Sequence, residues 1–450
     1  MSRAEPSGYS LRSTIALAAS VIMLGGGLYA VPAYAGKAQA LHVFRGTPDG
    51  NYPSNRLFPL AGALYGATAY GGIVCGASAI GCGTVFETVP SPHGNIQKTI
   101  YRFTGGPGDG AVPGSGALIA DASGALYGTT ISAGNGPCNY FGVAGCGVVY
   151  KLTPTATGYS ESVVYNFQGK RDGANPVYGV VADAFGNLYG TTSAGGSGKC
   201  PGGGCGVVYK LTLTPSGYVE SVIFRFDGVN GTYPDATPII DDAGVLYGTT
   251  FDGGTGVCDT YGGGCGAVYK LAPTGKHYEE TVLYNFQGGA DGVQVQSGLY
   301  EDSHGNLYGM TTFGGTGPCA VSGLPAGCGT IFELSPNGAT YTKSTVYNFQ
   351  GSDGSLPTGN LYPGPGGVLY GAAPFGGSGT CNDYGIVGCG VVFALSASKT
   401  GYAEKVLYNF ESTNRVGIYP NDPLLYAGKF YVSMCCGGRN QFGTLARIGR

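Results

Sequence analysis

Fourteen cysteines fall into seven pairs along the chain, and their spacing suits disulfides better than a metal site. The pairs are Cys75/Cys82, Cys138/Cys146, Cys200/Cys205, Cys258/Cys265, Cys319/Cys328, Cys381/Cys389 and Cys435/Cys436. Zinc needs fixed ligand geometry, but the paired cysteines are separated by zero to eight residues and no histidine recurs beside them. We therefore expect disulfides and an exported protein.

The expected role of these bridges is to hold Gly-rich loops that have little apolar content of their own. The adjacent pair Cys435/Cys436 most simply bonds to itself, and two free thiols are the alternative.

A series of aspartates forms the second group with possible chemistry. An Asp/Asn-Gly-x-x-Pro motif recurs, complete or nearly so, and its carboxylates are Asp49, Asp109, Asp172, Asp291 and Asp353. The structural interpretation is a tight turn, because Asp bonds its own backbone and Gly accepts positive φ. The functional interpretation is a ring of carboxylates at a channel mouth that binds sugar hydroxyls or Ca²⁺. One carboxylate per unit is too dispersed to assign a metal, so no cofactor is expected.

Tyrosines in the cysteine loops are the third group, and they suit ligand contact better than catalysis. A ring on a braced loop offers a large contact surface and a hydroxyl, and the candidates are Tyr140, Tyr261 and Tyr384. The alternative is that these rings cover the disulfides. The four histidines occupy non-equivalent positions, and no nucleophile elbow, HExxH or phosphate loop occurs. No catalytic residue is therefore named.

These residues are positioned by a repeat. Leu-Tyr-Gly recurs at steps of 58 to 62 residues, with tyrosines at Tyr65, Tyr127, Tyr189, Tyr247, Tyr308 and Tyr370, and a degenerate seventh copy lies at 429–432. Each unit contains four short segments rich in Val, Ile, Tyr and Thr, bounded by Gly, Asp, Asn and Pro. This pattern predicts an all-β, seven-bladed β-propeller with four-stranded blades, whose strands we letter A to D from the centre outward.

The two ends of the chain predict how the ring closes. The last unit ends just after its strand C, and so it lacks a strand D. The aromatic pair that ends strand D elsewhere, as in Tyr101/Phe103, reappears as His42/Phe44 before the first strand A. We expect the N-terminal strand to complete the last blade and remove an exposed edge. Stacked sheets of a β-helix would not require this complementarity.

The N-terminus predicts the protein's destination. Residues 1–35 contain Arg3 and Arg12, an apolar run and Ala33-Tyr34-Ala35, which is typical of a secretory signal peptide. A retained membrane anchor is the alternative. We expect residues 36–450 to form one domain, secreted or periplasmic, with no membrane span. Net charge is −3 without a Lys/Arg cluster, which argues against nucleic acid as a partner.

The repeated string resembles the GloVer tandem repeat of exported bacterial "choice-of-anchor" proteins. The closest segments are 187–192 with 206–212, and 306–311 with 329–336, and the resemblance covers about residues 41–450. It implies an exported bacterial propeller and no particular activity. We expect a binding or interaction module for an extracellular glycan or a surface protein. A carbohydrate-active enzyme, lyase or hydrolase, and a purely structural surface protein are the alternatives.

Overall fold

The computed structural model describes residues 37–449, apart from 55, 76–79, 90–95, 141, 259–262, 384, 399–400 and 413–414. The predicted signal peptide, residues 1–35, lies outside the described residues. The described chain consists of β-strands and two short 3₁₀ turns, η1 (Gly289–Asp291) and η2 (Pro365–Gly367). No helix among these residues is long and apolar enough to span a membrane.

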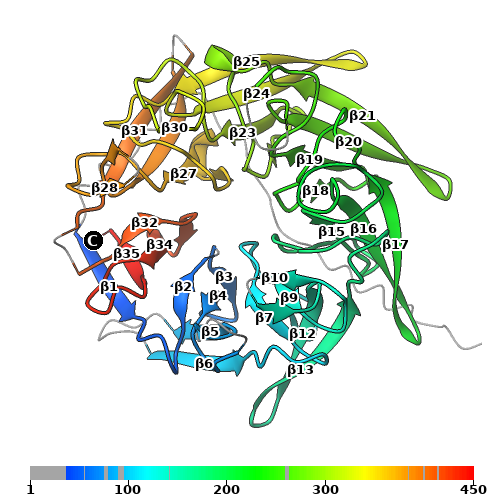
Figure 1. The fold of residues 1–450 in the computed structure, drawn as a ribbon. Coiled ribbons are helices and arrows are strands. Elements are labelled where there is room, and N and C mark those ends of the chain that lie inside the picture. Colours follow the sequence, from blue (N-terminus) through cyan, green and yellow to red (C-terminus); the bar gives the residue numbers. More distant parts are fainter. Residues whose placement is uncertain are drawn as a thin grey trace, which may run out of the picture. The chain divides into compact units, whose positions relative to one another are not determined.

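Seven antiparallel sheets follow one another around a centre, which confirms the predicted seven-bladed propeller (Figure 1). The strands B are β4 (Ala63–Tyr70), β9 (Leu126–Ala133), β15 (Leu188–Thr192), β19 (Leu246–Thr250), β23 (Leu307–Thr311), β27 (Leu369–Ala373) and β34 (Lys429–Cys436). The strands C are β5 (Thr84–Val89), β12 (Val148–Thr155), β16 (Val207–Thr214), β20 (Ala267–Thr274), β24 (Thr330–Asn337), β30 (Val391–Ser398) and β35 (Thr444–Ile448). The strands D are β6 (Ile96–Arg102), β13 (Gly158–Asn166), β17 (Gly217–Arg225), β21 (His277–Asn285), β25 (Thr340–Asn348), β31 (Gly401–Asn409) and β1 (Ala38–Val43).

The N-terminal strand closes the ring as predicted. Strand β1 pairs antiparallel with β35, and the two lie side by side in Figure 1. The register skips Leu41, between Ala40 and His42. Strand β13 skips Val164 in the same way where it pairs with β12. The N-terminal strand therefore reproduces the bulge of an ordinary strand D.

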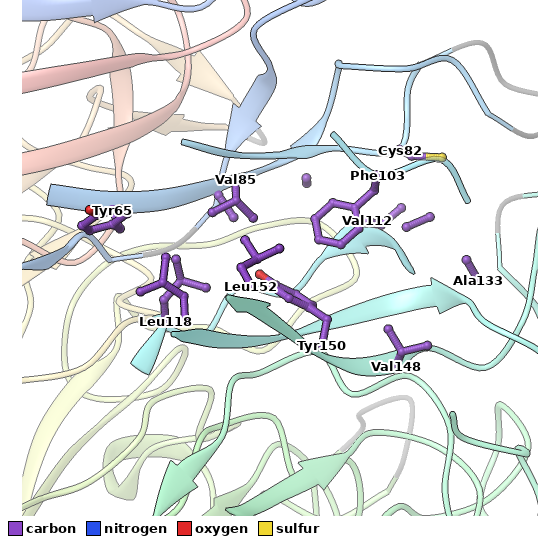
Figure 2. Packing of buried hydrophobic residues seen from close by; sticks show 14 of the residues in the cluster. Tyr65, Cys82, Val85, Phe103, Val112, Leu118, Ala133, Val148, Tyr150 and Leu152 are labelled. Atoms are coloured by element: carbon purple, nitrogen blue, oxygen red, sulfur yellow. The ribbon is translucent and has the colours of Figure 1, made fainter. Parts of the chain in front are cut away.

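Aromatic side chains join each blade to the next. Phe103, at the end of strand D of blade 1, meets Tyr150 of blade 2 edge to face at 5.0 Å between ring centroids (Figure 2). Phe44 of the N-terminal segment meets Phe86 at 5.3 Å. The Gly of Leu-Tyr-Gly makes room for this packing, because a Cβ on Gly128 would lie 2.5 Å from Tyr150 Oη. The repeated Gly is thus a packing requirement within the blade, and it lets the strand C ring lie where it meets the preceding blade.

The innermost strand A is interrupted in every blade. Its lower part pairs with the start of strand B in all blades: β3 (Phe58–Leu60), β8 (Ile119–Ala120), β14 (Val181–Ala182), β18 (Ile239–Ile240), β22 (Tyr300–Glu301), β26 (Tyr362–Pro363) and β33 (Leu424–Tyr426). Its upper part pairs with the end of strand B, as β2 (Asn51–Pro53), β7 (Gly110–Pro113) and β32 (Ile418–Pro420) or as single bridges. Between the two parts, three to six residues leave the regular ladder. The collar is defined as the following seven segments within these stretches: 54 with 56–57, 114–118, 177–180, 235–238, 296–299, 358–361 and 421–423.

Candidate ligand site in the central channel

The collar surrounds a cavity of about 650 Å³ that is lined by residues from all seven blades. Aromatic, amide and charged side chains line it together with apolar ones. The polar and aromatic ones include Arg56, Tyr178, Gln296, Asn360, Tyr362 and Asp422. A cavity of this size, mostly preformed and carrying a few convergent polar groups, is typical of a small-molecule site.

The repeat loses its regularity at the collar. The three residues after the motif's proline are Ser-Asn-Arg at 54–56, Gly-Ser-Gly at 114–116, Val-Tyr-Gly at 177–179, Asp-Ala-Thr at 235–237, Thr-Gly-Asn at 358–360 and Asn-Asp-Pro at 421–423. The fifth unit has Gln-Ser-Gly at 296–298 without the proline. Strands B, C and D keep similar residues around the ring. The cavity is therefore chemically asymmetric inside a nearly symmetric scaffold.

Hydrogen bonds between blades hold the collar in place. Asn360 Oδ1 accepts the Gly298 N–H at 2.6 Å, and the Asn360 N–H donates to Asp422 Oδ1 at 3.0 Å. Asn421 Nδ2 donates to the Pro53 carbonyl at 2.8 Å. Together these bonds join blades 5, 6, 7 and 1. On the opposite side, the Ser115 N–H donates to the Val177 carbonyl at 2.7 Å.

Further contacts fix an aromatic and acidic cluster within this network. The Tyr362 hydroxyl donates to Asp422 Oδ2 at 2.9 Å, and Asn360 Nδ2 donates to Tyr362 Oη at 3.1 Å. Burial raises the pKa of Asp422, although these hydrogen bonds and Arg56 oppose that effect. Burial and the nearby Asp422 also raise the pKa of Tyr362 well above its ordinary value. Tyr362 is therefore a neutral phenol at physiological pH.

Two polar groups of blade 1 have no partner in the cavity wall. The Arg56 guanidinium lies over the Tyr362 ring, 3.6 Å from its centroid. Arg56 Nε and Ser54 Oγ are buried and make no hydrogen bond within the part of the chain that the structure describes. Buried polar groups are normally paired, so a ligand atom is a natural partner for both.

Blade 4 contains a pair of carboxyls, Asp235 and Asp252, that are not among the residues lining the cavity. Asp252 is fully buried and accepts a hydrogen bond from Gln294 Nε2 at 3.0 Å. Burial, and then Asp252, raise the pKa of Asp235 to about 7. Asp235 Oδ1 is buried without a hydrogen bond among the described residues. Asp235 in turn interacts electrostatically with Tyr178 and Tyr140, whose pKa values are raised chiefly by burial. Asp235 is thus a candidate proton donor at neutral pH.

The five aspartates predicted from the sequence lie in the D–A turns and do not line this cavity. Asp172 accepts from the Gln168 N–H at 2.8 Å and from the Tyr165 hydroxyl at 2.9 Å. The other four aspartates accept a backbone N–H in the same way: Asp49 from Arg45, Asp109 from Thr104, Asp291 from Gln287 and Asp353 from Gln350. These contacts are those of the structural interpretation, and ligand binding by the five carboxylates stays a prediction. No cluster of three potential metal ligands occurs among the described residues.

The predicted tyrosines have different positions. Tyr140 lies on β10 (Asn139–Tyr140), which pairs with β11 (Val143–Ala144) inside the cysteine loop of blade 2. Tyr140 is partly buried, and it is not among the residues that line the cavity. A similar hairpin, β28 (Asn382–Asp383) with β29 (Ile386–Val387), occurs in blade 6. Tyr261 and Tyr384 lie outside the described residues.

Disulfides brace the loops that connect strands B and C. The structure joins all seven sequence pairs, including Cys435 with Cys436, and no described cysteine is free. The predicted disulfide bonding is therefore confirmed. Seven disulfides are typical of proteins that fold in an oxidising compartment.

The burial of these bridges adds a second role to the expected bracing of the loops. The second cysteine of each of the first six pairs is fully buried, and these residues are Cys82, Cys146, Cys205, Cys265, Cys328 and Cys389. Cys82 packs in the same apolar cluster as Phe103, and Cys205 in the same cluster as Phe226. These six cysteines are therefore core residues and not accessible groups of a ligand site.

Their position in the repeat explains this burial. Each of the six directly precedes the glycine that begins the strand C region, so it lies at the end of the loop next to the sheet. Each also bonds to the next blade through its backbone: the Cys82 carbonyl accepts the Val112 N–H at 2.8 Å, and the Cys265 carbonyl accepts the Gln294 N–H at 2.8 Å. The carbonyls of Cys328 and Cys389 accept the N–H groups of Leu356 and Tyr419 in the same way. The disulfides thus attach the loops to the junctions between blades.

Sequence reasoning missed the cavity residues Arg56, Gln296, Asn360 and Asp422. The available signal was their divergence, because these positions vary between units whose neighbouring strands barely change. In a closed ring, a varied position next to the innermost strand faces the common centre.

Comparisons with known proteins support the repeat assignment. A profile described as the Gloeobacter/Verrucomicrobia repeat matches residues 23–261, 78–317 and 203–446, which confirms the resemblance. No curated protein matches the chain. Similar solved structures include a candidate 6-phosphogluconolactonase from Bacteroides uniformis, with 12% identity, a TM-score of 0.46 and coverage of 80% of this chain and 90% of that one. A gluconolactonase from Xanthomonas campestris has 13% identity, a TM-score of 0.40 and coverage of 74% and 85%. Function is therefore inferred from the channel of this chain itself.

Proposed function

The chain belongs to the Gloeobacter/Verrucomicrobia repeat family, and we propose that it is an exported binding module that holds a short saccharide in its central channel. One observation carries the proposal: seven unlike collar segments converge on a single cavity of about 650 Å³. A purely structural ring has no reason to differ from blade to blade at this position.

The chemistry of the lining suits a sugar. A saccharide presents hydroxyls, which both donate and accept, and apolar C–H faces that pack on aromatic rings. Tyr52, Tyr178 and Tyr300 supply rings, while Gln296 and Thr358 supply polar groups. The channel therefore offers both kinds of contact to one ligand.

The shape of the site favours a glycan over a surface protein. A stable protein interface needs about 800 Å² on each partner, whereas the collar groups face inward around a narrow axis. A chain end of a polysaccharide fits such a channel. The disulfides support an oxidising location, and a signal peptide at 1–35 would deliver the protein to the periplasm or outside the cell.

A glycan-cleaving enzyme is the second candidate, and Asp235 is the observation that favours it. A carboxyl with a pKa of about 7 can donate a proton at neutral pH, as general acids of glycosidases do. Asp235 itself does not line the cavity, but Thr237, two residues further along the chain, does.

The two candidates are separated by a glycan array followed by calorimetry and by analysis of the bound glycan for cleavage. We expect binding without turnover, and at least a tenfold loss of affinity in Gln296→Ala. Gln287→Ala, an exposed amide on the outer D–A turn, is the matched control and should bind normally. Cleavage that disappears in Asp235→Asn would establish the enzyme instead, and absence of any glycan binding would refute the proposal.

A further inference from the structure

We infer, on the basis of the proposed function, that the channel selects an acidic saccharide and that Arg56 holds its carboxylate through two parallel N–H···O bonds. The ligand is then a uronic acid, and Arg56 is the residue that recognises it. The first evidence is the distribution of charge inside the cavity.

Among the described residues that line the cavity, Arg56 is the cation and Asp422 the anion. Both oxygens of Asp422 are already occupied, Oδ1 by the Asn360 N–H and Oδ2 by the Tyr362 hydroxyl. No ion pair within 4.0 Å joins Arg56 to a carboxylate of the described chain. The hydrogen bonds of Asp422 therefore hold the collar together, and the N–H donors of the Arg56 guanidinium remain available for a ligand.

The position of the guanidinium prepares it for a planar anion. The guanidinium carbon lies 3.6 Å from the centroid of the Tyr362 ring, and this cation–π contact holds the group against the ring. A guanidinium has five N–H donors in a rigid fork that matches the two oxygens of a carboxylate. Arg56 Nε is buried and without a partner in the described chain. A buried N–H donor without an acceptor is unfavourable, and a ligand carboxylate would supply that acceptor.

The remaining lining determines what else the ligand must carry. Ser54 Oγ lies two residues from Arg56 and also lacks a described partner, so it suits a hydroxyl next to the carboxylate. A phosphate would bring up to two negative charges to a cavity that holds one cation and one carboxyl. The single guanidinium therefore fits a singly charged carboxylate better than a phosphorylated sugar.

Binding is tested by calorimetry on the full-length mature protein with trigalacturonic acid and triglucuronic acid, each beside its neutral trisaccharide, and with glucose 6-phosphate. A charge-assisted hydrogen bond contributes about 1.5–3 kcal/mol, which corresponds to roughly a tenfold to 150-fold preference for at least one acidic trisaccharide. Arg56→Met should remove the preference for the acidic trisaccharide over its neutral counterpart. Arg56→Lys keeps the charge but not the fork, so its preference should be intermediate. Arg171→Met, on an exposed turn of blade 3, is the matched control.

The outcomes are distinct from those of the proposed function. Binding of neutral glycans with no preference for either acid, or a preference that survives Arg56→Met in a protein with normal thermal melting, overturns the inference but not the proposed function. Tighter binding of glucose 6-phosphate than of either acidic trisaccharide overturns the choice of a carboxylate. Binding of no saccharide refutes both.

Discussion

Stability should fall between acidic and mildly alkaline pH because of one carboxylate that recurs on the outer strands. Glu161, Glu220 and Glu404 occupy the same register, each opposite the equivalent leucine of strand C. Each has a buried Oε1 without a hydrogen bond among the described residues. Each also faces an aspartate of the preceding blade's D–A turn. Burial, and then that aspartate, raise their pKa values to about 7, 7 and 8.

The direction follows from proton linkage. The unfolded chain releases these protons near the ordinary glutamate pKa of about 4.3, whereas the folded protein keeps them to pH 7–8. Their contribution to stability is therefore complete below about pH 4.3, is lost as pH rises through 7–8, and is constant above. One pKa unit corresponds to about 1.4 kcal/mol, but these carboxyls are only partly buried and solvent weakens the effect. About 1 kcal/mol for each, or about 3 kcal/mol in all, is a reasonable magnitude.

The perturbation is the triple variant Glu161→Gln, Glu220→Gln and Glu404→Gln. At about 2 °C for each kcal/mol, the wild type should lose about 6 °C more than the variant between pH 5 and pH 9. Differential scanning calorimetry across this range measures the difference. Other groups that titrate, including Asp235 and Glu280, are common to both proteins and cancel. Equal losses in the two proteins would refute the assignment of protons to these glutamates.

The fifth blade provides an internal comparison. Lys343 replaces glutamate at the same register, and its Nζ lies 2.7 Å from Asp291 Oδ1. The lysine side chain is only 5% exposed. Glu404→Lys should form the same pair with Asp353 and raise the melting temperature at pH 9 by a few degrees. A lower melting temperature at pH 9 would show that blade 6 cannot accommodate the pair.

Three further changes test the closure, the loops and the collar. Deletion of residues 38–43 should lower the melting temperature and cause aggregation seen by light scattering, because β35 becomes an open edge; a stable monomer would contradict the closure. Cys138→Ala with Cys146→Ala should lower the free energy of unfolding by about 2–3 kcal/mol in urea denaturation, and no change would show that the hairpin needs no brace. Asn360→Ala should lower the free energy of unfolding by about 1–3 kcal/mol, because the Gly298 N–H loses its acceptor. Asn135→Ala, at an exposed position, is its control. An equal loss in both variants would show that the collar contact is not special.

Most of the fold could be predicted because its determinants repeat. The Gly of Leu-Tyr-Gly must be small where Tyr150 packs on Gly128, and the aromatic pair of strand D must fill the space between blades. Such constraints recur in each unit and are visible as a period. The closing strand could also be predicted, because His42 and Phe44 occupy the positions that Tyr101 and Phe103 occupy in the first blade.

The candidate site could not be predicted in the same way. The regular spacing of the motif predicted Asp172 and its equivalents as the site. Their carboxylates are instead held by turn N–H groups such as that of Gln168. Arg56 and Gln296 share no residue type and no motif. Their proximity depends on the closure of the ring, which brings residues about 240 positions apart in the sequence to one cavity.

The division between repeated and varied positions has a physical cause. Strands B and C are hydrogen-bonded on both sides and buried against neighbouring blades, so a substitution there disturbs the packing. The collar segments have left the regular ladder, and several of their side chains line the channel instead of packing between strands. Residues as different as Arg56, Tyr178 and Gln296 therefore occupy this place in different blades. A ring of similar units can bind an asymmetric ligand only by differing where the units meet, and in this protein that place is the collar.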